Sequence, residues 1–85
     1  MEDIEFLLKI FDFRKDVNIC SFKNCKNKYF DSFIITKTNI KKQIKKDLAE
    51  VKICENHLKE KGKLINILNE KFAKDFWIYS IKIKK

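Results

Sequence analysis

Proline is absent from the 85 residues, and glycine and arginine each occur once, as Gly62 and Arg14. A single glycine excludes the G-x-G-x-x-G fingerprint and the phosphate-binding P-loop, because both need more than one glycine. The shortage of proline and glycine also excludes flexible or proline-rich linkers. We therefore expect residues 1–85 to form a single domain.

Long hydrophobic runs are missing as well. No apolar stretch approaches the roughly 20 residues of a membrane-spanning helix. The chain begins Met1-Glu2-Asp3, which is acidic and unlike the basic and then apolar start of a secretory signal. We expect an intracellular protein of a reducing compartment, the cytoplasm or nucleus, that has no membrane partner.

Acidic residues are outnumbered, with 12 against 20 basic ones, which gives a formal net charge of +8. A surplus of this sign favours polyanionic partners such as DNA, RNA or an acidic protein surface. All basic residues except Arg14 are lysines. Lysine acts as a point charge on phosphate, whereas arginine reads guanine edges through two hydrogen bonds, so we do not expect sequence-specific base recognition. A solvated surface with no anionic partner would show the same lysine bias.

The residues that can hold a soft metal ion are few and closely paired. Cys20 and Cys25 form a C-x4-C pair, and after 28 intervening residues Cys54 and His57 form a C-x2-H pair. A spacing of three on a helical turn places both side chains on one face, so one ion can bridge them. Two such pairs brought together make a tetrahedral site for one structural zinc ion. A structural metal is the usual supplement in a chain too short to bury a large core.

Other interpretations of the same residues stay open. A disulfide would leave one of the three cysteines unpaired. Buried core cysteines with a packed histidine are common in small domains. A catalytic cysteine–histidine pair would need a base beside one particular thiol, and nothing in the sequence singles out a thiol. The fourth ligand is also open, since Glu55 or Asp16 could take the place of His57.

The arrangement of the four residues resembles the treble-clef class of zinc fingers. In that class a cysteine knuckle, here residues 18–27, is followed by strand structure and by a helix that opens with the second ligand pair. The resemblance covers residues 18–72 and implies a structural zinc ion. It implies no single function, because treble clefs occur in nucleases, ribosomal proteins, transcription factors and protein-binding adaptors. The chain has no second histidine to act as a general base, so an HNH-type nuclease is not expected.

The hydrophobic pattern predicts an α+β fold, a small zinc-stapled domain with a short sheet and two to three helices. Residues 3–13 fit an amphipathic helix, although their apolar side chains also alternate as in a strand. Residues 28–37 and 75–83 are rich in β-branched and aromatic side chains and predict two neighbouring strands. Helical spacing of apolar residues predicts helices at 39–50 and 55–73.

The second of these helices should bury one apolar stripe. A glycine inside a helix costs roughly 1 kcal/mol relative to alanine, so a stop at Gly62 and a restart at Lys63 is the alternative. The side chains expected in the core are Leu58, Ile65, Leu68 and Phe72.

Lysines occupy the outer arc of the predicted helix at 39–50 and predict a nucleic-acid-binding surface. Such a surface would bind phosphates with little sequence specificity and with strong salt dependence, in a regulatory role. An equally good interpretation is that the lysines only keep the helix soluble. We do not expect an enzyme, because four protein ligands close the zinc coordination shell. The candidate contact residues are Lys41, Lys42, Lys45, Lys46 and Lys52.

A protein-binding role is the alternative. The bias toward Lys, Ile, Asn and Phe, with only two alanines, suggests an AT-rich coding source such as a virus or phage. The chain would then be an adaptor or inhibitor that docks on a larger nucleic-acid-processing protein through the apolar face of residues 77–83. The same strand could pair with a second copy to form a homodimer. Aromatic residues beside lysines, such as Phe76 and Trp77, could stack on unpaired bases or belong to the core.

Overall fold

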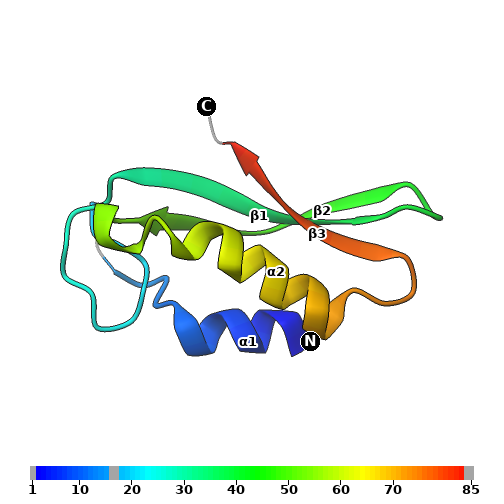
Figure 1. The fold of residues 1–85 in the computed structure, drawn as a ribbon, viewed down its shortest axis with the longest axis horizontal. Coiled ribbons are helices and arrows are strands. Elements are labelled where there is room, and N and C mark those ends of the chain that lie inside the picture. Colours follow the sequence, from blue (N-terminus) through cyan, green and yellow to red (C-terminus); the bar gives the residue numbers. More distant parts are fainter. Residues whose placement is uncertain (1, 16–17, 84–85) are drawn as a thin grey trace.

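The computed structural model describes residues 2–15 and 18–83. The elements follow one another as α1 (Glu2–Ile10), β1 (Asp31–Asn39), β2 (Ile44–Ile53), the short 3-10 helix η1 (Glu55–His57), α2 (Glu60–Phe72) and β3 (Trp77–Ile83). The strands form one antiparallel sheet in the order β2-β1-β3, and both α-helices lie on the same side of it (Figure 1). The chain is therefore a single α+β domain, as the sequence predicts.

β1 is the central strand because it pairs with β2 along one edge and with β3 along the other. Phe33 lies opposite Val51 of β2, and Ile35 lies opposite Ile81 of β3. Phe33, Ile35 and Val51 are buried in the main core. Alternate residues of a strand point to the same side of a sheet, so these side chains form the face that the helices cover.

The helix predicted at residues 39–50 is wrong, because this stretch forms a β-hairpin. The chain turns after β1, where the Asn39 side chain accepts a hydrogen bond from the Lys42 backbone N–H at 2.9 Å. Gln43 has a left-handed backbone with φ 55°, which continues the turn and ends any helix there. Pairing with β1 and burial of Val51 and Ile53 then favour a strand over the local helical spacing.

α1 forms a helix, which decides between the two interpretations of residues 3–13. Its first turn carries Glu2, Asp3 and Glu5, and acidic groups there interact favourably with the helix dipole. Leu7 faces the core and is buried. The helical spacing therefore outweighs the apolar alternation, because only one face of this segment packs against the core.

α2 begins at Glu60 and continues through Gly62 without a break. The separation from η1 falls at residues 58–59 instead, so a stop at Gly62 is not observed. Leu64 and Leu68 are its buried residues, whereas Leu58 is 38% exposed and lies outside the core. Ile65 and Phe72 are half-buried against the core.

In the part of the chain that the structure covers, no helix combines the length and apolar character needed to cross a membrane.

β3 is an edge strand whose apolar face is already in use. Tyr79 is buried in the main core and Ile81 packs against it, on the side that α2 covers. The core therefore uses the middle of this face, while Ile83 at its end is 73% exposed, and docking of a partner protein on the face stays a prediction. The outer edge of β3 has no neighbouring strand among the described residues. A homodimer through this edge stays a prediction.

A buried polar cluster ties α1 to the sheet. The Asp3 carboxylate accepts hydrogen bonds from the Tyr79 hydroxyl at 2.8 Å and from the Lys37 ammonium at 3.0 Å. Burial by itself raises the pKa of Asp3, but the hydrogen bonds from Tyr79 and Lys37 outweigh it and hold the pKa below its usual value. The Ile4 backbone N–H also donates to it at 2.8 Å, so the cluster contains an ionised carboxylate with three donors.

Replacing Tyr79 by phenylalanine should make stability less sensitive to alkaline pH. Burial, and then the hydrogen bond to Asp3, raise the pKa of Tyr79 above its ordinary value of about 10. Because the folded-state pKa is the higher one, the phenol's contribution is complete below about pH 10 and is lost as the pH rises above that value. Tyr79→Phe should cost about 1 kcal/mol at neutral pH and flatten the alkaline loss, measured by urea denaturation. Parallel alkaline losses in variant and wild type would contradict this.

Candidate metal centre

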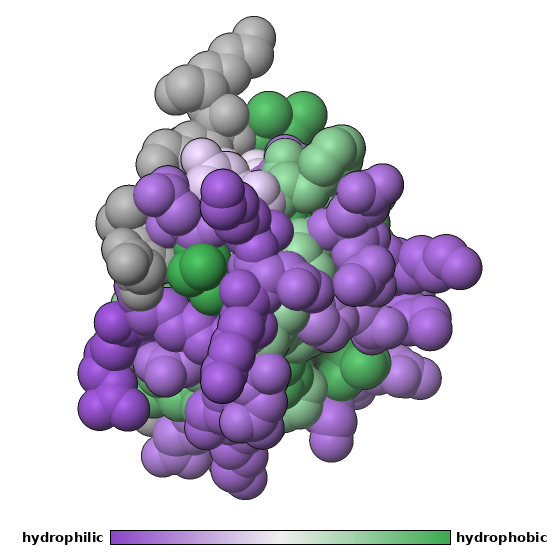
Figure 2. All heavy atoms as spheres, turned by 90° about the vertical axis from the view of Figure 1, so that its left-hand side faces the viewer, coloured by the Kyte–Doolittle hydropathy of each residue, from purple (hydrophilic) through white to green (hydrophobic). Residues whose placement is uncertain are grey.

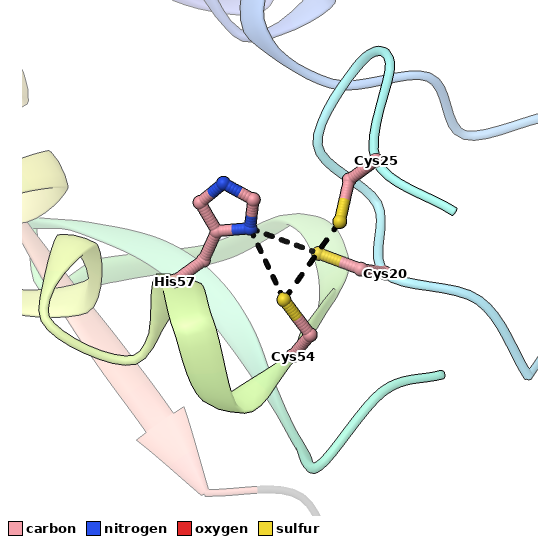
Figure 3. Close-up of side chains that lie close together, drawn as sticks. All are labelled: Cys20, Cys25, Cys54 and His57. Atoms are coloured by element: carbon pink, nitrogen blue, oxygen red, sulfur yellow. Dashed lines mark hydrogen bonds between the residues drawn. The ribbon is translucent and has the colours of Figure 1, made fainter. Parts of the chain in front are cut away.

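Four side chains from three separate segments converge at one end of the sheet (Figure 3). Cys20 and Cys25 lie on the loop at residues 18–27 between α1 and β1, which we call the knuckle. Cys54 directly follows β2, and His57 is the last residue of η1. The order along the chain is therefore a cysteine knuckle, a β-hairpin, and a helical segment that opens with the second pair.

The potential ligand atoms lie close together. The Sγ atoms of Cys25 and Cys54 are 3.7 Å apart, and His57 Nδ1 lies 3.2 Å from Cys54 Sγ and 3.6 Å from Cys20 Sγ. All four ligand atoms lie within 4.8 Å of one another. The three cysteines are free and buried, and His57 is half-buried. This arrangement is compatible with binding one metal ion.

The alternative ligands are not part of this group. Glu55 is exposed and does not belong to the cluster that Cys20, Cys25, Cys54 and His57 form. Asp16 lies outside the described residues. Within the part of the chain that the structure describes, His57 is therefore the residue that completes the three-cysteine set.

The end of the hairpin determines the positions of Cys54 and His57. Phe30 donates its backbone N–H to the Ile53 carbonyl at 2.8 Å, which fixes β2 up to the residue before Cys54. Cys54 itself is extended, with φ −82° and ψ 169°, and η1 starts immediately after it. The His57 backbone N–H then donates to the Cys54 carbonyl at 3.1 Å, which folds the imidazole back over the thiol.

The knuckle is fastened to the hairpin through Ser21 and to the end of α1 through Lys23. Ser21 donates its backbone N–H to the Lys52 carbonyl at 2.7 Å, and its hydroxyl accepts the Lys52 N–H at 3.0 Å. The Ser21 carbonyl accepts from the Asp12 N–H at 2.8 Å, and Lys23 donates to the Ile10 carbonyl at 3.0 Å. The site therefore connects the first third of the chain to the end of β2.

Lys15 holds the knuckle closed, a role that sequence reasoning missed. Its Nζ donates to the carbonyl oxygens of Cys20 at 3.0 Å and Cys25 at 2.6 Å, and also to that of Phe22. Backbone N–H groups of Phe22 and Cys54 in turn donate toward the Cys20 thiol. The loop thus directs carbonyls to a cation and N–H groups to sulfur. Nothing marks Lys15 in the sequence, since it is one lysine among many.

The thiols differ in their acid–base properties. Burial raises the pKa of Cys20 to about 11. Burial also acts to raise the pKa of Cys54, but donors around its sulfur outweigh this and lower the pKa to about 6. These donors include the Asn27 side-chain amide, 3.8 Å away, and the backbone N–H of His57. Since metals bind the thiolate, at least one sulfur of the group is favoured in its ligand form at neutral pH.

Phe22 covers the imidazole and links the cluster to the main core. Its ring stacks on His57 with centroids 4.3 Å apart, and meets the Phe11 ring edge-on at 4.8 Å. Phe22 packs against both the main core and the cysteine cluster. Figure 2 looks onto this end of the molecule, where the surface is mainly hydrophilic with separate hydrophobic patches. The three candidate cysteine ligands are therefore interior groups, with the half-buried His57 beside them.

The five predicted contact lysines divide between two places. Lys41 and Lys42 lie in the hairpin turn, and Lys45 and Lys46 lie at the start of β2, all four exposed. Lys45 and Lys46 point to opposite faces of the strand, because consecutive residues alternate. Lys52 lies at the other end of β2, beside the knuckle, with its Nζ 3.9 Å from the Glu50 carboxylate and 5.9 Å from the Tyr29 ring centroid. The structure thus groups four of the five lysines and separates the fifth.

Comparisons with protein-family models, with curated proteins and with solved structures give no match for this chain.

Proposed function

We propose that the chain is a treble-clef-type zinc module that binds nucleic acid through its hairpin. Zinc bound tetrahedrally at about 2.3 Å to sulfur and about 2.0 Å to nitrogen separates its ligand atoms by about 3.5–3.8 Å. The distances of 3.7 Å between two sulfurs and 3.6 Å between sulfur and Nδ1 match this spacing, whereas Cys54 Sγ and His57 Nδ1, 3.2 Å apart, lie slightly closer than it requires. A set of three thiolates and one imidazole suits zinc, and knuckle, hairpin and helix follow in the treble-clef order.

The zinc ion would have a structural role. Four protein ligands leave no open position for a substrate or a reactive water. Its ligands come from the knuckle, the end of β2 and η1, which otherwise share few apolar side chains besides Phe22. The ion would therefore hold together segments that a chain of this length has too little core to fix by packing alone.

The hairpin tip, which we define as residues 37–46, carries the nucleic-acid proposal. Residues 32–46 contain five lysines and no acidic residue. Lys37 is paired with Asp3, but the other four, in the turn and at the start of β2, are exposed, namely Lys41, Lys42, Lys45 and Lys46. This group of four exposed lysines, with no acidic residue between them, is the observation that supports the proposal most, because phosphates are attracted to a cluster of cations. The hairpin tip would bind nucleic acid with little sequence specificity, in a regulatory role.

Salt dependence tests this proposal. Four lysine–phosphate contacts predict a log–log slope of affinity against salt of about −3 to −4, measured by fluorescence anisotropy with duplex and single-stranded oligonucleotides. Lys41→Gln, Lys42→Gln and Lys45→Gln should each reduce the magnitude of the slope by about one. Lys59→Gln is the matched control, because Lys59 is exposed beyond the tip, between η1 and α2. A slope near zero, or equal effects of all four substitutions, would sink the proposal.

Protein binding is the second candidate. Exposed apolar side chains lie in the hairpin tip and in the neighbouring residues 76–78, namely Ile40, Ile44, Phe76 and Ile78, each at least 40% exposed. An adaptor or inhibitor, virus- or phage-encoded, would use such a surface to dock on a larger nucleic-acid-processing protein. Its binding would depend little on salt, so the measurement above separates the two candidates.

A further inference from the structure

We infer that the hairpin tip binds single-stranded nucleic acid, with one unpaired base stacked on the exposed ring of Phe76. This inference rests on the proposed nucleic-acid function and names the form of nucleic acid that the site accepts. Phe76 lies in the tight turn that joins α2 to β3, beside the hairpin.

The turn holds Phe76 in an unusual conformation. Asp75 and Phe76 both have left-handed backbones, with φ 56° and 71°. A bulky residue rarely adopts this region, and such strain tends to persist at sites with a function. The Phe76 side chain is also 59% exposed, so the conformation does not serve to bury the ring.

Hydrogen bonds lock this turn to the hairpin. The Ile40 backbone N–H donates to the Phe76 carbonyl at 3.0 Å, and the Asn39 side-chain amide donates to the Asp75 carbonyl at 3.2 Å. Asn39 is 2% exposed and its oxygen accepts from Lys42, so one buried side chain organises both turns. Phe76 is therefore presented by a fixed scaffold, which reduces the ordering cost of binding a ligand.

Cations flank the aromatic rings. Lys41 Nζ lies 5.2 Å from the Phe76 ring centroid, and the Trp77 ring has Lys37 Nζ at 4.8 Å and Lys46 Nζ at 6.0 Å. The Trp77 ring is half-buried and Lys37 is held by Asp3, so the exposed groups are the Phe76 ring and the lysines of the turn. Lysines beside an exposed aromatic ring are the combination by which proteins hold single strands, with phosphates on the cations and a base on the ring.

A hollow of about 360 Å³ lies at this place, lined by Asn39, Lys41, Lys42, Asp75, Phe76 and Trp77. The Asp75 carboxylate repels phosphate, so a base and not the backbone should occupy the hollow beside Phe76. Aspartate can also accept a hydrogen bond from a base amino group. In a duplex the faces of the bases are covered by their neighbours, and only an unpaired base can stack on the ring.

Substitution of Phe76 tests the inference on the zinc-loaded chain of residues 1–85. Phe76→Leu should weaken binding of a deoxythymidine oligomer by about 5- to 100-fold, which corresponds to one lost base stack, while leaving the salt slope and the duplex affinity unchanged. Phe76→Trp should retain or tighten single-strand binding. The matched control is Tyr29→Leu, because Tyr29 is also an exposed aromatic beside a lysine but lies near the knuckle.

Three results would overturn the inference, and they point to different causes. Equal affinity for duplex and single strand, with a steep salt slope, would leave the proposed function standing and remove the stacking on Phe76. No binding of either oligonucleotide at low salt would remove the proposed function as well. Tighter binding of polyglutamate than of the oligomer would make the tip a site for acidic protein segments. Trp77, the sole tryptophan, gives a second readout, because a stacked base should quench its fluorescence.

Discussion

Removing the metal ion should unfold the domain and not merely loosen one loop. Structural zinc contributes an apparent 10–16 kcal/mol or so to small domains, about as much as the whole stability of a typical domain of 5–15 kcal/mol. Treatment with a chelator, or Cys54→Ser, is therefore expected to abolish the cooperative thermal transition and the dispersion of the amide NMR spectrum. Adding one equivalent of zinc should restore both in the chelated wild type but not in the variant.

Two further variants separate ligation from packing. Lys26→Ser changes an exposed residue next to Cys25 and should leave metal binding and folding intact. His57→Ala should lose the metal, whereas His57→Cys should keep it, because a fourth thiolate can replace the imidazole. If His57 served only to pack against Phe22, both substitutions would destabilise the protein to a similar degree, and the four-ligand account would fail.

Replacing Asp3 by alanine is the second large effect that we expect. The Asp3 carboxylate is 5% exposed and is bound by Lys37 and Tyr79. Removing it leaves a largely buried ammonium and a buried hydroxyl without their acceptor, a loss that typically costs about 3–5 kcal/mol. Urea denaturation at neutral pH should show a drop of this size.

The matched control is Glu2→Ala, an exposed acidic residue in the same helical turn. It should change the free energy of unfolding by less than about 1 kcal/mol, since only the helix-dipole interaction is affected. The double variant Asp3→Ala, Lys37→Met should lose less than the sum of the two single changes, because no unpaired charge remains. Additive losses would mean that Asp3 and Lys37 do not act as a pair.

The hairpin shows where prediction from the sequence fails. Ile40, Ile44 and Leu48 are spaced as on a helix, but the turn depends on Asn39, whose side chain bonds two separate backbone segments. The contact with Lys42 is local and would also suit a helix N-cap, but the contact with Asp75 and the pairing with β1 join distant residues, so local periodicity does not reveal them. By contrast, α1 has a single apolar face and little competition from sheet pairing, and its helical pattern is correct.

The metal cluster was accessible to prediction because its residue types are rare. Three cysteines and one histidine in two short pairs leave few ways to combine them, and the structure brings all four together. The residues that support them could not be predicted, since lysine and asparagine are abundant in this chain and nothing distinguishes Lys15 and Asn27 from the others. Lys15 donates to backbone carbonyls of the knuckle, and Asn27 to the sulfur of Cys54. Lys52 lies apart from the other lysines because residues 44–53 form an extended strand. Lys45 and Lys46 lie at the start of this strand and Lys52 near its end.

Mass spectrometry of the purified, chelator-free protein under native and then denaturing conditions tests the central claim most directly. The account predicts one zinc ion per chain under native conditions, released on denaturation, with three free thiols in the denatured protein. A folded, reduced and monodisperse protein without bound metal would contradict it, and Cys20, Cys25 and Cys54 would then be ordinary core residues beside a packed histidine.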